Sequence, residues 1–310
     1  MIFNFILANH HETSLNSLGD LVEPICHGLE DCGHHVIRYG IDLHRAPTVN
    51  VLVEFFKDDT IVDDFLRYKR DLGDGFVLGL IGTEDPDDRM VMDSYPNRRR
   101  NLERLAAAVD FVWTLLPVES FYREICGAER VRLLRYGFSE RCVEPDMIRE
   151  PKWRDIDAVL YGNPHPYRQR LVRALEAKGL TCVCTQREAY PDYVASDLIR
   201  RAKVLLDVRR GPEVRYLSPT RILRGLHSGT AVLSEQFDAS ALAYLYDYTV
   251  AGPYDALAER CREIISGGAF VELGFAALAK FRAETSMRDN MAQALDTPVF
   301  QRLLAAEHRP

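Results

Sequence analysis

Residues 201–235 read RAKVLLDVRRGPEVRYLSPTRILRGLHSGTAVLSE, and the order of apolar and polar runs in this segment is the most informative about the fold class. It passes from an apolar run, KVLLDV, through a polar loop into an amphipathic segment, and after Gly229 into a second apolar run, TAVLSE. Ser218 followed by Pro219 is typical of a helix start, because a serine side chain caps free amides and proline suits the first helical position. A strand, a helix and a second strand in this order predict a parallel βαβ unit.

The same alternation of short apolar runs and amphipathic segments continues over the rest of the chain. Strands are expected at residues 3–8, 35–39, 49–55, 76–81, 111–115, 131–134, 158–161, 181–184, 204–208, 231–234 and 248–250. Helices are expected at residues 17–31, 61–72, 98–108, 119–125, 166–178, 193–201, 219–227 and 256–265.

Pro145 and Pro151 interrupt this pattern within a charged stretch, CVEPDMIREPKWRD, that is typical of an exposed linker. We therefore expect two Rossmann-like α/β domains, at residues 1–150 and 151–285, with a cleft between them. The helices of residues 286–310 are expected to pack back on the first domain.

The composition excludes several classes of protein. The chain has 310 residues, of which 47% are hydrophobic, and its net charge is −7. An acidic chain does not offer the basic face that a nucleic-acid scaffold needs, so no nucleic-acid partner is expected. The apolar start, MIFNFILA, lacks a basic n-region and is expected to be a buried strand, and no apolar run reaches the ~20 residues of a membrane span. The seven scattered cysteines are expected to be reduced thiols of a cytoplasmic protein.

Two segments of the second domain could bind an anion. Thr220 and Arg221 would lie in the exposed first turn of a helix, where free amides and the helix dipole favour a phosphate and a guanidinium can grip it. Gly162 and Asn163 follow a strand, where glycine lets a ligand approach the backbone, and Arg168 follows on the next helix. The alternatives are an ordinary βαβ unit with a solvated or salt-bridged arginine and an ordinary turn. No GxGxxG pattern is present, so a dinucleotide fingerprint is not predicted.

These segments resemble a known family. DIDAVLYGNPHPYRQRLVRALEAKGL resembles the opening of the C-terminal domain of group-1-like GT-B glycosyltransferases, particularly the CgeB-like branch. RAKVLLDVRR and SPTRILRGLHSGTAVLSE resemble the nucleotide-binding half of that domain. The resemblance covers residues 155–235 and is weaker in the N-terminal half, where SLNSLGDLVEPICHGLEDCGHHVIRYG is similar to many GT-B acceptor domains.

The resemblance implies a nucleotide-sugar donor site in the second domain. The resemblance implies that the following residues of this donor site lie near the diphosphate or the sugar: Gly162, Asn163, Arg168, Ser218, Thr220, Arg221, Ser234 and Glu235. The sequence departs from the family pattern at one motif. Retaining members usually carry two glutamates spaced by seven residues, and the second glutamate holds the ribose. The corresponding positions, aligned through Gly229, are Tyr216 and Arg224, so neither is acidic.

Candidate acceptor residues lie in the first domain. Asn9, His10 and His11 directly follow the first expected strand, so they should project into the cleft. A histidine there could remove the proton of the acceptor hydroxyl, since its pKa lies near working pH, or it could bind a sugar hydroxyl or cap the helix that follows. Glu84 is a second candidate acceptor contact. Its acidic loop resembles a metal-binding motif of another glycosyltransferase fold, but a solvated loop is the simpler interpretation, and no metal site or other cofactor is expected.

The sequence thus predicts a metal-independent glycosyltransferase that moves a sugar from a nucleoside diphosphate to a hydroxyl of a glycan, a lipid-linked sugar or a small metabolite. Helix N-termini and Arg221 would stabilise the charge of the leaving diphosphate. The loss of the glutamate pair favours an alternative, a non-catalytic GT-B-like protein that binds a nucleotide or glycan. A third interpretation is another enzyme on the same fold, such as a nucleotide-sugar epimerase.

Overall fold

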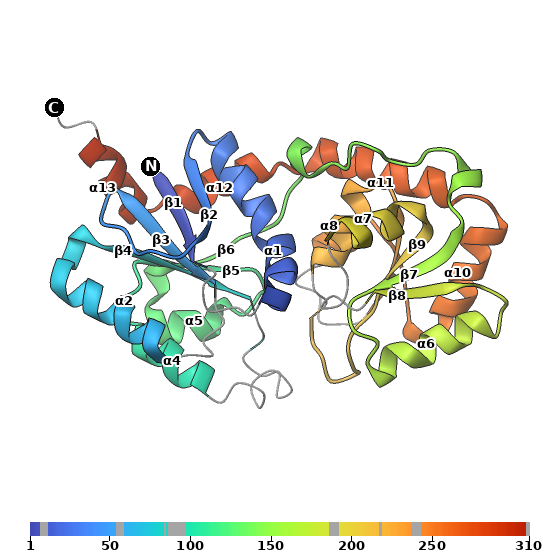
Figure 1. Cartoon of the computed structure of the whole chain (residues 1–310), viewed down its shortest axis with the longest axis horizontal. Helices are drawn as coiled ribbons and strands as arrows, with labels where there is room; N and C mark the ends of the chain where they lie inside the picture. Colours follow the sequence, from blue (N-terminus) through green and yellow to red (C-terminus); the bar gives the residue numbers. More distant parts are fainter. Residues whose placement is uncertain are drawn as a thin grey trace. The chain divides into compact units, whose positions relative to one another are not determined.

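The structure, a computed structural model, describes residues 1–6, 12–53, 59–83, 85, 97–185, 192–216, 219–236 and 243–307. The chain forms two compact units. Unit 1 comprises Met1–Leu15, Pro24–Gly137 and Met287–Pro310, and unit 2 comprises Asn16–Glu23 and Phe138–Ser286. Each unit contains one parallel sheet with helices on both of its faces (Figure 1). The predicted α/β class with two Rossmann-like domains is therefore confirmed.

The sheet of unit 1 has the strand order β2-β1-β3-β4-β5-β6, and each strand pairs with its neighbours in parallel. Its strands are β1 (Ile2–Ile6), β2 (His35–Gly40), β3 (Thr48–Val53), β4 (Val77–Gly82), β5 (Phe111–Thr114) and β6 (Val131–Leu133). Its helices are α1 (Glu12–Asp31), α2 (Asp59–Leu72), α4 (Asn97–Leu105), α5 (Glu119–Cys126), α12 (Met287–Leu295) and α13 (Pro298–Glu307). Helix α1 begins earlier than expected, and its Asn16–Glu23 segment belongs to unit 2.

Two buried amides hold the centre of this sheet in register. Asn4 of β1 and Asn50 of β3 are both fully buried, and the Nδ2 of Asn4 donates to the Oδ1 of Asn50 over 3.1 Å. The Nδ2 of Asn50 donates in turn to the carbonyl of His44 over 2.7 Å. Buried polar groups are costly unless they are hydrogen-bonded, so these amides favour one register of β1 against β3.

Aromatic packing joins the end of the chain to this sheet. Phe300 of α13 is fully buried, and its ring lies 4.8 Å from that of Phe111 and 5.9 Å from that of Phe3. Gly79 of β4 leaves room for Phe111, since a Cβ at this position would lie 2.0 Å from the Phe111 ring. Trp113 completes the cluster against Phe300 at 6.0 Å.

The sheet of unit 2 has the strand order β11-β10-β9-β7-β8, again with parallel pairings. Its strands are β7 (Ile156–Tyr161), β8 (Cys182–Thr185), β9 (Ala202–Asp207), β10 (Ala231–Glu235) and β11 (Val250–Gly252). Its helices are α6 (Pro166–Glu176), α7 (Asp192–Arg201), α8 (Pro219–His227), α9 (Ala243–Tyr246), α10 (Leu257–Ser266) and α11 (Phe270–Glu284). Helices α6 and α10 pack together, as do α8 and α11 (Figure 1).

Arg154 corrects the expectation that the whole stretch around Pro145 and Pro151 is an exposed linker. Its side chain is 1% exposed, and its guanidinium donates to the carbonyls of Ile148, Ala202 and Gly229 over 2.7–3.1 Å. Burial lowers the pKa of Arg154 to about 10. This arginine therefore fastens the stretch to the amino ends of the strands of unit 2, because carbonyl oxygens replace the water that its charge would otherwise require.

We predict that Phe300→Ala lowers the free energy of unfolding by about 3–5 kcal/mol, the usual cost of removing a buried phenylalanine ring. Urea denaturation followed by near-UV circular dichroism measures this change. Leu304→Ala is the matched control on the same helix, since Leu304 is 38% exposed. Equal losses in the two variants would contradict the role of the aromatic cluster.

Candidate functional site

Two loops of unit 2 meet where the order of its strands reverses. From β7 the chain passes to β8 on one side and then returns to β9 on the other side. In open parallel sheets, ligands bind outside the carboxyl ends of the strands at such a point. The candidate site consists of the loop after β7, the loop after β9, and the helices α6 and α8 that these loops enter.

Gly162 begins the first loop in a conformation that favours glycine. Its φ is +115°, and its amide donates to the carbonyl of Thr185 at the end of β8 over 2.8 Å. Among the described residues, a Cβ at Gly162 would meet only the Nη1 of Arg168, at 3.5 Å. A Cβ at this position would thus meet little of the described protein, although Gly162 itself is buried, and Asn163 follows it in a partly buried position. The predicted contact of Gly162 and Asn163 with a donor stays a prediction.

Arg168 joins the two loops. It is 4% exposed, its Nε donates to the carbonyl of Val208 over 2.9 Å, and its Nη1 donates to the carbonyl of Asn163 over 3.0 Å. The guanidinium therefore fixes the distance between the loop after β7 and the loop after β9. Its predicted contact with a donor stays a prediction, and its observed contacts are with the protein backbone.

Arg221 is buried, which corrects the expectation of an exposed helix start. It is 4% exposed, and its Nε donates to the Oδ1 of Asp207 over 2.7 Å. Asp207 is fully buried at the end of β9, and its Oδ2 accepts a hydrogen bond from the Oγ of Ser234 over 2.9 Å. A buried carboxylate requires such partners, so Arg221 and Ser234 each have a structural task at this site.

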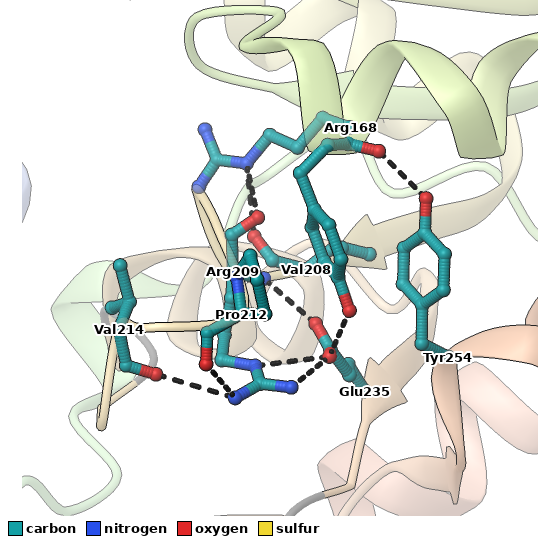
Figure 2. A network of polar contacts seen from close by, with 8 residues as sticks. Arg168, Val208, Arg209, Pro212, Val214, Glu235 and Tyr254 are labelled. Atoms are coloured by element: carbon teal, nitrogen blue, oxygen red, sulfur yellow. Dashed lines mark hydrogen bonds and ion pairs between the residues drawn. The ribbon is translucent and has the colours of Figure 1, made fainter.

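Glu235 lies at the end of the neighbouring strand, β10, and is also fully buried. Figure 2 shows its carboxylate between Arg209, from the loop after β9, and the phenol of a tyrosine of α6. The Nε of Arg209 donates to the Oε1 of Glu235 over 2.9 Å, and the hydroxyl of Tyr167 donates to the same oxygen over 2.7 Å. Glu235 is thus held by protein donors, and its predicted contact with the nucleotide-sugar donor stays a prediction.

His165 lies directly before α6, near two arginines of the site. Burial, together with the charges of Arg168 and Arg210, lowers the pKa of His165 below its ordinary value. The imidazole is therefore neutral near pH 7, while two guanidinium groups from different elements lie near it. A site with this charge favours an anionic ligand.

Arg224 stands where the resemblance implies the second, ribose-binding glutamate, and it makes contacts within the protein. Arg224 of α8 donates from its Nε to the Oδ1 of Asp20 over 2.8 Å and from its Nη1 to the Oγ of Ser196 over 2.7 Å. Asp192 is a further ion-pair partner of Arg224. Arg224 thus links α8 with α7 and with the Asn16–Glu23 segment of unit 2. Tyr216 lies in the loop before α8 and is partly buried.

Five predicted site residues lie outside the part of the chain that the structure describes. They are Asn9, His10, His11, Glu84 and Ser218. Thr220 is described and is 1% exposed, in the first turn of α8. The structure thus brings Gly162, Asn163, Arg168, Thr220, Arg221, Ser234 and Glu235 to one edge of the second sheet.

The sequence reasoning missed Asp207, Arg209 and Tyr167. One signal was available: Asp207 and Glu235 each end an apolar run, LLD and VLSE, and an acid in that position needs a cationic partner when the strand is buried. The sequence does not show which arginine pairs with which acid, because a loop and a helix start lie between Arg209 and Arg221 and either could reach the strand ends.

Within the described ranges, no group of three or more His, Cys, Asp or Glu side chains is placed to hold a metal ion. All seven cysteines are free thiols. In the same ranges, no single helix is long and apolar enough to span a membrane, although the bent pair Tyr254–Ser266 and Phe270–Leu295 meets both criteria when taken together.

The fold is similar to that of solved glycosyltransferases. The structure of Anabaena Alr3699/HepE in complex with UDP-glucose aligns with a TM-score of 0.57 and 10% identity, over 99% of this chain and 98% of that chain. An alpha-glucosyltransferase in complex with UDP-glucose and DNA containing an abasic site aligns with a TM-score of 0.57 and 8% identity, over 95% of this chain and 98% of that one. No model of a known protein family matches the sequence, and no curated protein matches it.

We predict that Arg221→Ala lowers the free energy of unfolding by about 3–5 kcal/mol, because it leaves the buried carboxylate of Asp207 without its cationic partner. Chemical denaturation of the variant measures this loss. Arg282→Ala is the matched control, since its ion pair with Glu140 is solvent-exposed and such pairs contribute only about 0–1 kcal/mol. Two variants as stable as the parent protein would show that the Asp207–Arg221 pair is not a stabilising contact.

Proposed function

We propose that this protein is a glycosyltransferase that moves a sugar from a nucleoside-diphosphate donor to a hydroxyl acceptor. One observation carries the proposal: the open space beside Gly162, with Arg168 and Arg210 near His165, lies at the carboxyl edge of a parallel sheet. Solved structures with a similar fold include an alpha-glucosyltransferase in complex with UDP-glucose and Anabaena Alr3699/HepE in complex with UDP or UDP-glucose, which supports the choice of donor class.

The leaving group explains why this charge distribution suits the reaction. Breaking the bond between the sugar and the diphosphate increases the negative charge on the phosphate oxygens, and preorganised donors lower the barrier by stabilising that charge. Helices α6 and α8 both begin at this edge, so their free amides and dipoles favour an anion there. The buried ion pairs of Asp207 and Glu235 hold the surrounding loops, so little reorganisation is needed during the reaction.

The acceptor is a hydroxyl of a glycan, a lipid-linked sugar or a small metabolite in this proposal. Asn9 and Glu84 would bind it, and His10 or His11 would remove its proton. One of the similar solved proteins is in complex with DNA. We propose a non-nucleic-acid acceptor for this chain because its net charge is −7, and phosphate backbones are bound by basic surfaces.

A non-catalytic nucleotide- or glycan-binding protein is the second candidate. The observation that favours it is the replacement of the usual ribose-binding glutamate by Arg224, whose guanidinium is bonded to Asp20, Asp192 and Ser196. Such a protein would bind the donor and transfer nothing.

We predict that one nucleoside-diphosphate sugar raises the melting temperature, since a ligand at 100 times its Kd stabilises the native state by about 2.7 kcal/mol. A thermal-shift panel of UDP, GDP, ADP and dTDP sugars identifies the donor. Mass spectrometry of mixtures with glycan, lipid-linked, metabolite and duplex-DNA acceptors then measures transfer, with and without EDTA. Binding without transfer favours the binding protein, loss of transfer in EDTA contradicts metal independence, and the absence of any binding contradicts both candidates.

We also predict that alanine at His10 or His11 lowers the turnover number by ~10²–10⁴-fold and leaves donor affinity unchanged, if that histidine is the base. The reason is that the proposed donor contacts belong to unit 2, whereas both histidines belong to unit 1. Turnover and the anomeric configuration of the product are measured together for both variants. Full activity in both would remove these histidines from the mechanism.

A further inference from the structure

The carboxylate of Glu235 is the centre of a polar network that spans several elements of unit 2. Glu235 is fully buried, and its Oε2 accepts from the backbone amide of Arg209 over 3.1 Å. Its Oε1 accepts from the Arg209 side chain and from the hydroxyl of Tyr167. These protein donors occupy both oxygens of the carboxylate, so the network assigns Glu235 a task other than gripping a ligand directly.

The guanidinium of Arg209 extends this network into the loop after β9. Its Nη1 donates to the carbonyl of Pro212 over 3.1 Å and to that of Val214 over 3.4 Å (Figure 2). Pro212 is exposed and Val214 is partly buried. A loop with so little buried apolar surface has little packing to hold its shape, so hydrogen bonds from a fixed guanidinium supply much of the restraint.

Tyr167 binds Glu235 directly, and Tyr254 supports Tyr167. The rings of Tyr167 and Tyr254 stack with their centroids 4.1 Å apart, and the hydroxyl of Tyr254 donates to the backbone carbonyl of Tyr167 over 2.6 Å. Burial raises the pKa of Tyr167 above its ordinary value, and the neighbouring Glu235 raises it further. The phenol therefore keeps its proton and remains a hydrogen-bond donor to the carboxylate at neutral pH.

The restrained loop carries a residue of the candidate site. Arg210 follows Arg209 directly, and the Nε of Arg168 in α6 donates to the carbonyl of Arg209 over 3.2 Å, so the backbone that leads into Arg210 lies against α6. The charge of Arg210 also lowers the pKa of His165. A shift of the loop would move the Arg210 charge relative to His165 and Gly162. Since Coulomb interactions and hydrogen bonds to phosphate depend strongly on distance, the position of the loop controls the strength of an anion site here.

We propose that Glu235 is a positioning residue, which acts through Arg209 to hold the loop of residues 209–216 so that Arg210 meets the diphosphate of the donor. Tyr167 and Tyr254 hold Glu235 in place for this task. That the ligand is the diphosphate of a nucleotide sugar rests on the proposed function, whereas the restraint of the loop by Glu235 and Arg209 does not.

The test combines Glu235→Gln with Tyr167→Phe, which removes one hydroxyl and keeps the ring. Asp157→Asn is the matched control, because Asp157 forms a comparable ion pair with Lys203 over 2.6 Å at the opposite end of the same sheet. Hydrogen exchange of the amides of residues 210–216 is measured by mass spectrometry without any ligand. Titration calorimetry with the donor found in the panel, and steady-state kinetics, follow on the same proteins.

We expect Glu235→Gln to accelerate exchange in residues 210–216 by at least about tenfold, which corresponds to a loss of about 1.4 kcal/mol of local stability. Donor KM should rise by a similar factor while acceptor KM stays unchanged, and Tyr167→Phe should show the same pattern to a smaller extent. Unchanged exchange in both variants, equal acceleration in Asp157→Asn, or faster exchange with unchanged donor affinity would each overturn the proposal. If the parent protein binds no nucleotide sugar, the proposed function fails, and the exchange data still decide whether Glu235 restrains the loop.

Discussion

Two fully buried carboxylates, Asp207 and Glu235, govern the arrangement of the second unit. They end adjacent parallel strands, β9 and β10, so their negative charges lie at the same edge of the sheet. A buried charge without a partner costs several kcal/mol, and the fold must therefore bring cations to this edge. Arg221 meets Asp207 and Arg209 meets Glu235. The helix after β9 and the loop that leads to it are thereby fixed by electrostatics as well as by apolar packing.

The opposite edge of the same sheet is stabilised differently. There the buried Arg154 is surrounded by backbone carbonyls and the hydroxyl of Thr230. Carbonyls at the ends of secondary-structure elements are acceptors that need donors, and one guanidinium with five N–H groups supplies several at once. The amino edge thus has a buried cation bonded to the backbone and a partly exposed ion pair between Asp157 and Lys203, whereas the carboxyl edge has two fully buried carboxylates paired with arginines. The carboxyl edge combines buried ion pairs with open space beside the Gly162 backbone, and this combination suits an anionic ligand.

Arg224 shows that this fold forms without the glutamate that the resemblance implies at its position. The resemblance to group-1-like enzymes implies a glutamate at this position, but the chain has an arginine bonded to Asp20 and Ser196. Its guanidinium also lies 5.4 Å from the ring of Tyr161, whose hydroxyl donates to the same Asp20. These contacts keep α8 in place while changing the sign of the charge there. Fold similarity and the details of ligand recognition are therefore separable in this chain.

The periodic features could be predicted from the sequence alone: the alternating strands and helices, the two Rossmann-like units, and the glycine turn after β7. These follow from local rules, because apolar periodicity and glycine conformation act over a few residues. The sequence also placed Gly162 and Glu235 at strand ends and Arg221 in the first turn of a helix. Only the tertiary structure decided that Arg221 is buried against Asp207, that Arg209 holds Glu235, and that Arg154 is enclosed by carbonyls. Those partners are distant in sequence, and the choice among many arginines depends on distances and burial that only the folded chain creates.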